Sequence, residues 1–175
     1  ERPDLFVDDI IIKAPSRDIM NAMQRSVLAL YAYEDNADDI AMENVIRQSI
    51  SIIAKLPTIM VAAYQVKRRT YDRKSMYFHH SKEELSVAEN ILRTLRWDKQ
   101  FTDQEAKVLD LCLVLHAEHG GGNNSTFSAR VLTSTATDTY SAISAGIGSL
   151  KGPRHGGANA KVREMLDAIE EGVHN

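Results

Sequence analysis

The chain has 175 residues, 43% of them hydrophobic and 26% charged, which is the composition of an ordinary globular protein with one substantial core. A net charge of -3 leaves no excess of basic residues, so nucleic acid is not expected as a partner. The sequence has no leader-like N-terminus and no uninterrupted apolar run of bilayer length, and we therefore expect a cytoplasmic protein without a membrane partner.

The first third of the chain shows the apolar spacing that is typical of helices. After Pro15, apolar residues recur every three or four positions and predict one helix. A second helix is expected over 38–55, and a third over 58–67, because Pro57 should stop or kink the chain between them. Only residues 10–12 resemble a strand. The residues expected on the buried faces are Ile19, Met23, Val27 and Leu30 of the first helix, and Met42, Val45, Ile46, Ser49, Ile52 and Ile53 of the second.

Residues 71–80 read as an irregular loop, and two capping-box patterns follow it. The pattern Ser/Thr-x-x-Glu at 81–84 and again at 102–105 predicts a helix start at each place. The helix expected over 103–117 is apolar on nearly all sides, which predicts that it is buried inside a bundle. Its single cysteine, Cys112, is interpreted as a small buried hydrophobe.

The last part of the chain combines small residues with scattered apolar ones. Residues 125–150 are rich in Ser, Thr, Ala and Gly, and we expect one long or broken helix with closely packed neighbours. A final helix over 159–171 should bury Val162, Met165, Leu166 and Ile169. The sequence thus predicts an all-α, multi-helical bundle with at most one very short strand.

Two glycine-rich bends between helical segments carry histidines. One spans 116–123 and the other 150–159. Glycine lets the backbone turn sharply and lets a ligand approach, so histidines in such bends suggest an acid/base or carbonyl-binding pocket. The alternative is that each bend is a helix stop whose histidine caps the last carbonyls.

A metal site is the weakest interpretation of these histidines. His116 and His119 share a helix face, but they lack the i,i+4 spacing of zinc proteases and any local third ligand. The adjacent pair His79 and His80 is likewise expected to be solvent-exposed or peripheral. We therefore expect no metal, and the glycines match no nucleotide-binding loop.

The content and order of these blocks closely resemble the citrate synthase family in its bacterial form. The resemblance rests on 116–123, 125–130, 141–148 and 150–159, and it extends back through 53–59 and 88–92. It implies a helical large domain, used for dimerisation, over residues 1–150 and the start of a small domain over 151–175.

The resemblance also implies roles for the first histidine block. His119 would hydrogen-bond the carbonyl oxygen of oxaloacetate and polarise it, since negative charge develops there in the transition state. Asn123 would line the same pocket, and His116 would support it from behind. Asn123 has the alternative role of capping the next helix.

In the second block, His155 resembles the family histidine that hydrogen-bonds the thioester carbonyl of acetyl-CoA. Ser125 would orient that histidine, although Ser125 also has helix capping as an alternative role. Gly152 and Gly156 would let the coenzyme approach the backbone. Family members carry a further histidine with an arginine and a catalytic aspartate downstream, so this chain is expected to be an internal piece that is inactive alone.

The activity implied by the resemblance is that of citrate synthase, an acyltransferase of the tricarboxylic acid cycle. Acetyl-CoA and oxaloacetate would be condensed and citryl-CoA hydrolysed, by a homodimer without a bound cofactor. One alternative is 2-methylcitrate synthase, which uses propionyl-CoA. Another is that the piece is a non-catalytic helical dimerisation module.

Overall fold

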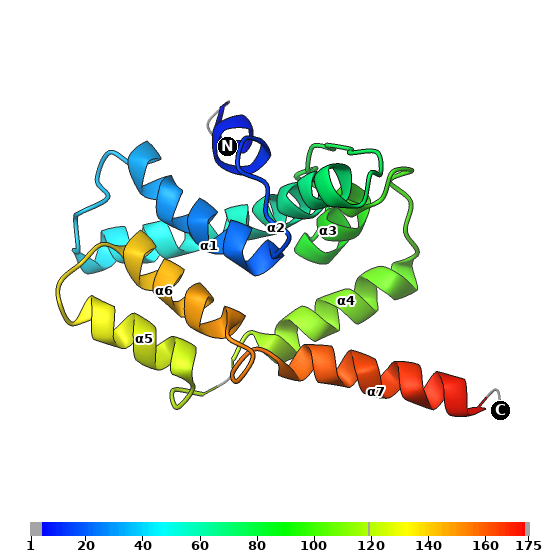
Figure 1. Ribbon diagram of the computed structural model, residues 1–175. Coiled ribbons are helices and arrows are strands. Elements are labelled where there is room, and N and C mark those ends of the chain that lie inside the picture. Colours follow the sequence, from blue (N-terminus) through cyan, green and yellow to red (C-terminus); the bar gives the residue numbers. More distant parts are fainter. Residues whose placement is uncertain (1–4, 119, 174–175) are drawn as a thin grey trace.

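The structure is a computed structural model that describes residues 5–118 and 120–173, and the regular elements in those residues are all helical (Figure 1). A short π-helix, η1 (Val7–Ile12), includes the segment that resembled a strand, so that interpretation is wrong. The expected all-α fold is confirmed. The α-helices are α1 (Ile19–Ala29), α2 (Met42–Tyr71), α3 (Val87–Leu95), α4 (Asp103–His116), α5 (Asn124–Thr133), α6 (Thr139–Lys151) and α7 (Ala158–Val173), and the 3-10 turn η2 (Leu30–Tyr33) follows α1.

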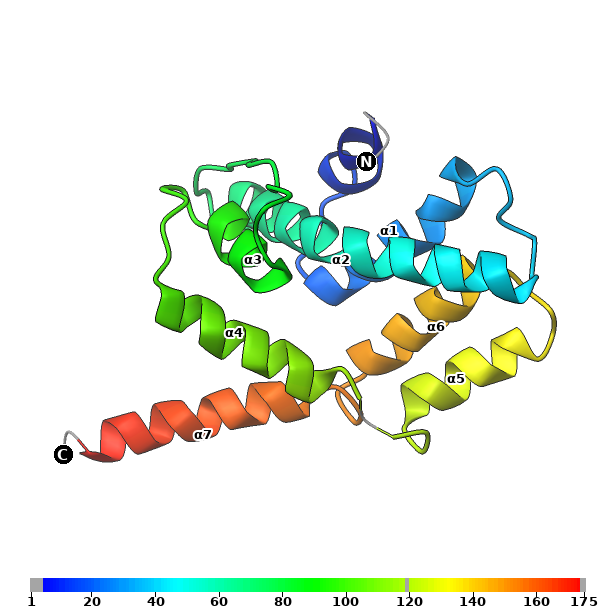
Figure 2. The same ribbon diagram turned by 180° about the vertical axis from the view of Figure 1, so that it is seen from behind.

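The hydrophobic core forms where α1, α2 and α6 meet. Helix α1 packs against both α2 and α6, and α5 packs on α6 (Figures 1 and 2). Because α6 is held on both sides, the turn that follows it starts from a fixed position. The core residues are Phe6, Ile11, Ala22, Val27, Leu30, Ala37, Ile52, Ile59, Ala62, Ala63, Val66 and Tyr140.

Helix α2 is continuous through Pro57, so the prediction of two separate helices there is wrong. Proline in a helix interior removes one backbone hydrogen bond and crowds the preceding turn, which costs about 3 kcal/mol. Ile52 and Ile59, on either side of it, are both buried in the core. Packing on both sides of the proline offsets this cost.

The N-terminal half of α2 has an apolar outer face. The helix begins at Met42 rather than 38, and Ile52 is buried as expected. The prediction that Met42, Ile46 and Ile53 point inward is wrong, because they are 68%, 52% and 66% exposed. With Ile50 they form an exposed stripe at helical spacing, which we call the α2 stripe.

Helix α2 is also the one described helix that is long and apolar enough to cross a membrane by length and composition. Its most apolar 18-residue window has a mean hydropathy of 1.4, and 39% of that window is buried. The buried share belongs to the core, which accounts for much of this apolar character.

Two capping boxes begin helices, but one of them lies elsewhere than predicted. Helix α4 begins at the expected Thr102–Glu105 box. Helix α3 instead begins at Ser86, whose hydroxyl accepts from the backbone N–H of Glu89, so the prediction at 81–84 is wrong. The Asn90 side chain binds the backbone of Lys82 through both N–H and carbonyl, which holds that segment as a turn.

The expected burial of α4 and α7 is wrong for this chain. Only Ala106 of α4 is buried, while Val108 and Leu115 are 57% and 68% exposed, and Cys112 is exposed too. The four apolar residues of α7 that were expected inside are each about half exposed. Figures 1 and 2 show α7 extending away from the other helices. The apolar faces are real, but within the described residues nothing covers them.

The boundary expected at residue 150 falls at the C-terminal end of α6, one residue before Lys151. The turn over 152–157 then leads into α7. The division into a large and a small domain stays a prediction.

The capping box of α4 gives a testable pH dependence. Hydrogen bonds from Arg96, and then from the backbone and side chain of Thr102, lower the pKa of Glu105 to about 2. Since the folded pKa lies below the ordinary value of 4.5, the stabilisation is present above pH about 4.5 and is lost as the pH falls toward about 2. Glu105→Gln should flatten this acid limb in urea unfolding, whereas Glu83→Gln, at an exposed loop carboxylate, should leave it steep.

Candidate functional site

The turn between α6 and α7 presents His155. The backbone N–H groups of His155 and Gly156 both donate to the carbonyl of Gly152, at 3.0 and 2.9 Å. These two bonds close the turn directly after α6, and His155 is left half-buried. The histidine therefore lies on a short, hydrogen-bonded support and not on a free loop.

The bend between α4 and α5 is closed by Asn123. Its Oδ1 accepts from the backbone N–H of Thr126 at 3.0 Å, and its Nδ2 donates to the carbonyl of Gly120 at 2.8 Å. Gly120 has φ +74°, in the left-handed region that favours glycine. Asn123 is thus the N-cap of α5, the alternative role considered for it, and its contact with a substrate stays a prediction.

The bend between α4 and α5 carries two histidines, His116 and His119. His116 is exposed, and its Nδ1 lies 2.7 Å from the carbonyl of Cys112, which can only accept, so Nδ1 carries a proton. It therefore satisfies a carbonyl in the last turn of α4, as the helix-stop interpretation predicts. His119, the candidate for oxaloacetate, lies outside the described residues.

The central feature of the site is the contact between Ser125 and His155. Ser125 Oγ lies 2.8 Å from His155 Nε2, although the two residues are thirty positions apart in the chain. The structure thus brings together the two residues that the resemblance pairs, and the orienting role of Ser125 stays a prediction. Because Nε2 is occupied by Ser125, Nδ1 is the ring nitrogen left for a ligand. When the serine hydroxyl donates to Nε2, the proton of a neutral imidazole is on Nδ1, which becomes a donor.

The glycines of the turn are close to the backbone of α6. A Cβ at Gly152 would lie 3.2 Å from the carbonyl oxygen of Ser149, and one at Gly156 would lie 1.8 Å from that of Leu150. The fold itself accounts for the glycine at Gly156. A contact of Gly152 or Gly156 with a coenzyme stays a prediction, and Arg154 beside them is exposed.

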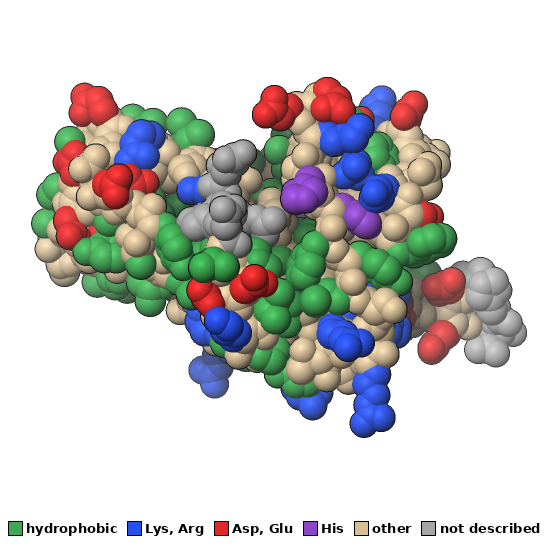
Figure 3. Space-filling view, turned by 90° about the horizontal axis from the view of Figure 1, so that it is seen from above, with side chains coloured by type: hydrophobic (Ala, Val, Ile, Leu, Met, Phe, Trp, Pro, Cys, Tyr) green, Lys and Arg blue, Asp and Glu red, His purple; other side chains and the backbone are tan. Residues whose placement is uncertain are grey.

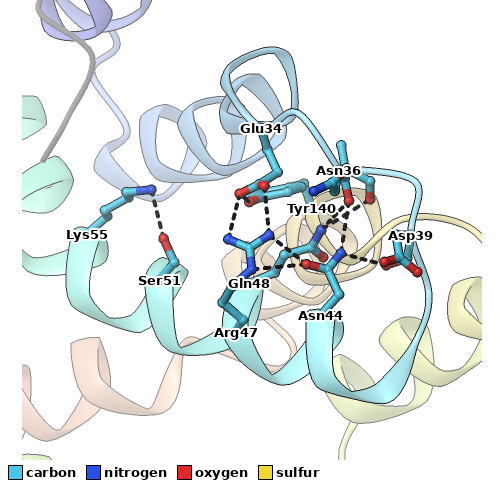
Figure 4. Close-up of polar contacts among 10 residues, drawn as sticks. Glu34, Asn36, Asp39, Asn44, Arg47, Gln48, Ser51, Lys55 and Tyr140 are labelled. Atoms are coloured by element: carbon cyan, nitrogen blue, oxygen red, sulfur yellow. Dashed lines mark hydrogen bonds and ion pairs between the residues drawn. The ribbon is translucent and has the colours of Figure 1, made fainter.

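A polar network fixes the opposite end of α6 (Figure 4). The Glu34 carboxylate accepts from Arg47 Nη2 at 2.7 Å and from the Tyr140 hydroxyl at 3.2 Å. Arg47 lowers the pKa of Glu34, while burial, followed by the charge of Glu34, raises the pKa of Tyr140 to about 12. The phenol stays protonated and acts as a donor. This network was not predicted from the sequence, since no local pattern joins residues 106 positions apart.

Other sites are poorly supported. Among the residues described, no group of three or more His, Cys, Asp or Glu side chains is placed to hold a metal ion. On the face seen in Figure 3, acidic and basic side chains are interspersed with apolar ones. A surface hollow lined by Tyr31 and residues 34–39 lies near the Tyr140 end of α6, away from His155.

Comparisons with known proteins agree on one family. The family model described as citrate synthase, C-terminal domain, matches residues 2–174. A citrate synthase of Haloferax volcanii is 39% identical over 155 residues, which cover 87% of this chain and 39% of that protein. The 2-methylcitrate synthase 2 of Corynebacterium glutamicum is 36% identical over 156 residues, with the same two coverages.

Solved structures give the same result. The citrate synthase of Thermoplasma acidophilum superposes on this chain with a TM-score of 0.78 and 25% sequence identity, and the match covers 97% of this chain and 42% of that one. That structure contains carboxymethyl coenzyme A and oxaloacetate. The chain thus spans about two fifths of the length of the relatives that it matches.

Proposed function

Because the chain belongs to the citrate synthase family, we propose that it carries part of the active site of an enzyme that makes citrate from acetyl-CoA and oxaloacetate. The observation that carries this proposal is the 2.8 Å contact between Ser125 and His155. It fixes one ring nitrogen and leaves the other for a substrate carbonyl.

In the proposed reaction, His155 Nδ1–H donates a hydrogen bond to the thioester carbonyl of acetyl-CoA. A carboxylate base removes a methyl proton, and the resulting enol or enolate attacks the keto carbon of oxaloacetate. The new carbon–carbon bond gives citryl-CoA, and water then cleaves the thioester to citrate and CoA. A positioned donor stabilises the charge that develops on each carbonyl oxygen, and loss of one such donor costs about 10²–10³-fold in rate.

We propose that the base belongs to polypeptide beyond these 175 residues. The chain spans 39% of its Haloferax volcanii relative. By the resemblance, the base is an aspartate that lies downstream of the matched span. We propose that catalysis requires that longer polypeptide, acting in the cytoplasm within the tricarboxylic acid cycle.

The choice of acyl group is tested by kinetics of the complete enzyme. The relative named 2-methylcitrate synthase 2 is 36% identical to this chain, against 39% for the citrate synthase of Haloferax volcanii. Propionyl-CoA is therefore the specific alternative. We expect release of the CoA thiol with oxaloacetate and a higher kcat/KM for acetyl-CoA. Preference for propionyl-CoA would favour the alternative, and release with neither would overturn both.

We also propose that the protein forms a homodimer. Helix α6 is mostly covered by α1 and α5, but α5 exposes Phe127, and the α2 stripe leaves four large apolar side chains in water. Exposed apolar surfaces of this kind mark interaction sites. A second copy of the chain, using the same surface, would cover it by twofold symmetry.

Sedimentation and scattering test the dimer. A compact monomer of this length has a radius of gyration of about 16 Å, and we expect a clearly larger particle. Ile50→Arg, in the α2 stripe, should give a monomer, because it buries a charge in the interface. Val87→Arg, at a residue 54% exposed on α3, should leave the mass unchanged. A wild-type monomer at micromolar concentration would contradict the proposal.

A further inference from the structure

One face of α6 touches the backbone on both sides of the Ser125–His155 contact. A Cβ at Gly146 would lie 3.5 Å from the carbonyl oxygen of Ser125. The carbonyl of Leu150 lies against Gly156, the residue after His155. Positions 146 and 150 are four apart and therefore lie on the same face of the helix. Both residues of the contact are therefore joined to backbone that lies beside the C-terminal half of α6.

The carbonyl group of Leu150 lies so close to Gly156 that there is no room for a side chain at this position. An ideal Cβ there would lie 1.8 Å from the Leu150 oxygen and 2.9 Å from its carbonyl carbon. These are backbone atoms of a packed helix, so they cannot swing away as the end of a flexible side chain can. Any side chain at this position must move the turn itself by about 1 Å.

We infer that Gly156 is a positioning residue for His155, and that its lack of a side chain lets the turn close on α6 and holds the ring against Ser125. This inference rests on the proposed function. A shift of about 1 Å at the neighbouring residue carries a 2.8 Å contact beyond hydrogen-bond distance. The role differs from the coenzyme contact predicted from the resemblance, because Gly156 acts through His155.

Kinetics of the complete enzyme separate the two roles. Gly156→Ala should lower kcat about 10²-fold, the cost of a misplacement of about 1 Å, while KM for acetyl-CoA changes little. Gly146→Ala is the matched control on the same helix face, since its Cβ would sit 3.5 Å from Ser125, an ordinary contact. It should keep nearly full kcat. A raised KM with unchanged kcat in Gly156→Ala would mean a coenzyme contact and would overturn the inference.

A second readout does not depend on catalysis. Nitrogen NMR of ¹⁵N-histidine in the complete protein reports the ring nitrogens of His155, assigned by their loss in His155→Ala. We expect Gly156→Ala and Ser125→Ala to shift the Nε2 signal alike, and Gly146→Ala to leave it in place. An unshifted signal in Gly156→Ala overturns the inference, even where the proposed activity fails and kinetics say nothing.

If Gly156→Ala does not fold, Gly157→Ala provides a second test. A Cβ at Gly157 would lie 2.4 Å from the carbonyl oxygen of Pro153, a less severe overlap within the same turn. Gly157→Ala should show the same shift of the Nε2 signal and a smaller loss of kcat. A folded Gly157→Ala protein with the wild-type signal and wild-type kcat would contradict the inference.

Discussion

Replacing His155 with alanine in the complete enzyme is expected to lower kcat about 10²–10⁴-fold and to leave oxaloacetate binding nearly unchanged. The ring that Ser125 holds at 2.8 Å would no longer donate to the thioester carbonyl, so the step that forms the nucleophile slows. Steady-state kinetics with acetyl-CoA give kcat, and calorimetric titration gives the affinity for oxaloacetate.

Two further variants make this expectation specific. His119→Ala should weaken both the rate and oxaloacetate binding, because that residue is proposed to contact oxaloacetate itself. His80→Ala, at an exposed histidine of the loop before α3, should change neither. Equal and mild effects at His119 and His155 would favour the interpretation that both histidines only cap helix ends.

The 175-residue chain alone is expected to show no steady turnover, which is the largest effect that we predict. The aspartate proposed as the base lies outside it, and one general acid or base contributes about 10²–10⁴-fold. Loss of the base together with the remaining binding residues should exceed that factor. A thiol-release assay on the purified chain measures this directly.

The complete enzyme under the same conditions is the control for that assay. Citrate formation by the isolated chain at ordinary enzyme rates would show that the assignment of the base to another segment is wrong. It would leave the family assignment, which rests on sequence similarity, in place.

Local patterns predicted the helices well where the cause of the structure is also local. The Thr102–Glu105 box and the apolar spacing of α1 act within a few residues, and both are confirmed. Pro57 was misleading because burial of Ile52 and Ile59 outweighs its local cost. A short stretch of sequence shows the proline, but it does not show how deeply the two isoleucines are buried.

Burial was harder to predict, because it depends on what covers a face. The apolar pattern of α4 and α7 identifies faces that need a cover, but not which segment or subunit supplies it. Val108 and Met165 are therefore 57% and 52% exposed in this chain. The network of Glu34, Arg47 and Tyr140 was missed for a related reason, since its members meet only in the folded protein.

The site was predicted in part through the resemblance. The pairing of Ser125 with His155 followed from it, and the two side chains lie 2.8 Å apart in the structure, while their roles stay predictions. The capping role of Asn123 was visible from residue type alone. The steric need for Gly156 was not visible, because it depends on where the carbonyl of Leu150 lies after α6 has packed.

The most direct test of the central claim is a crystal structure of the complete enzyme with oxaloacetate and carboxymethyl coenzyme A, the ligands of the Thermoplasma acidophilum complex. The proposed function predicts that Ser125 Oγ stays on His155 Nε2 while Nδ1 lies about 2.6–3.2 Å from an oxygen of the coenzyme analogue's acyl-like end. His155 turned away from the bound analogue, or the analogue bound at another surface, would contradict it.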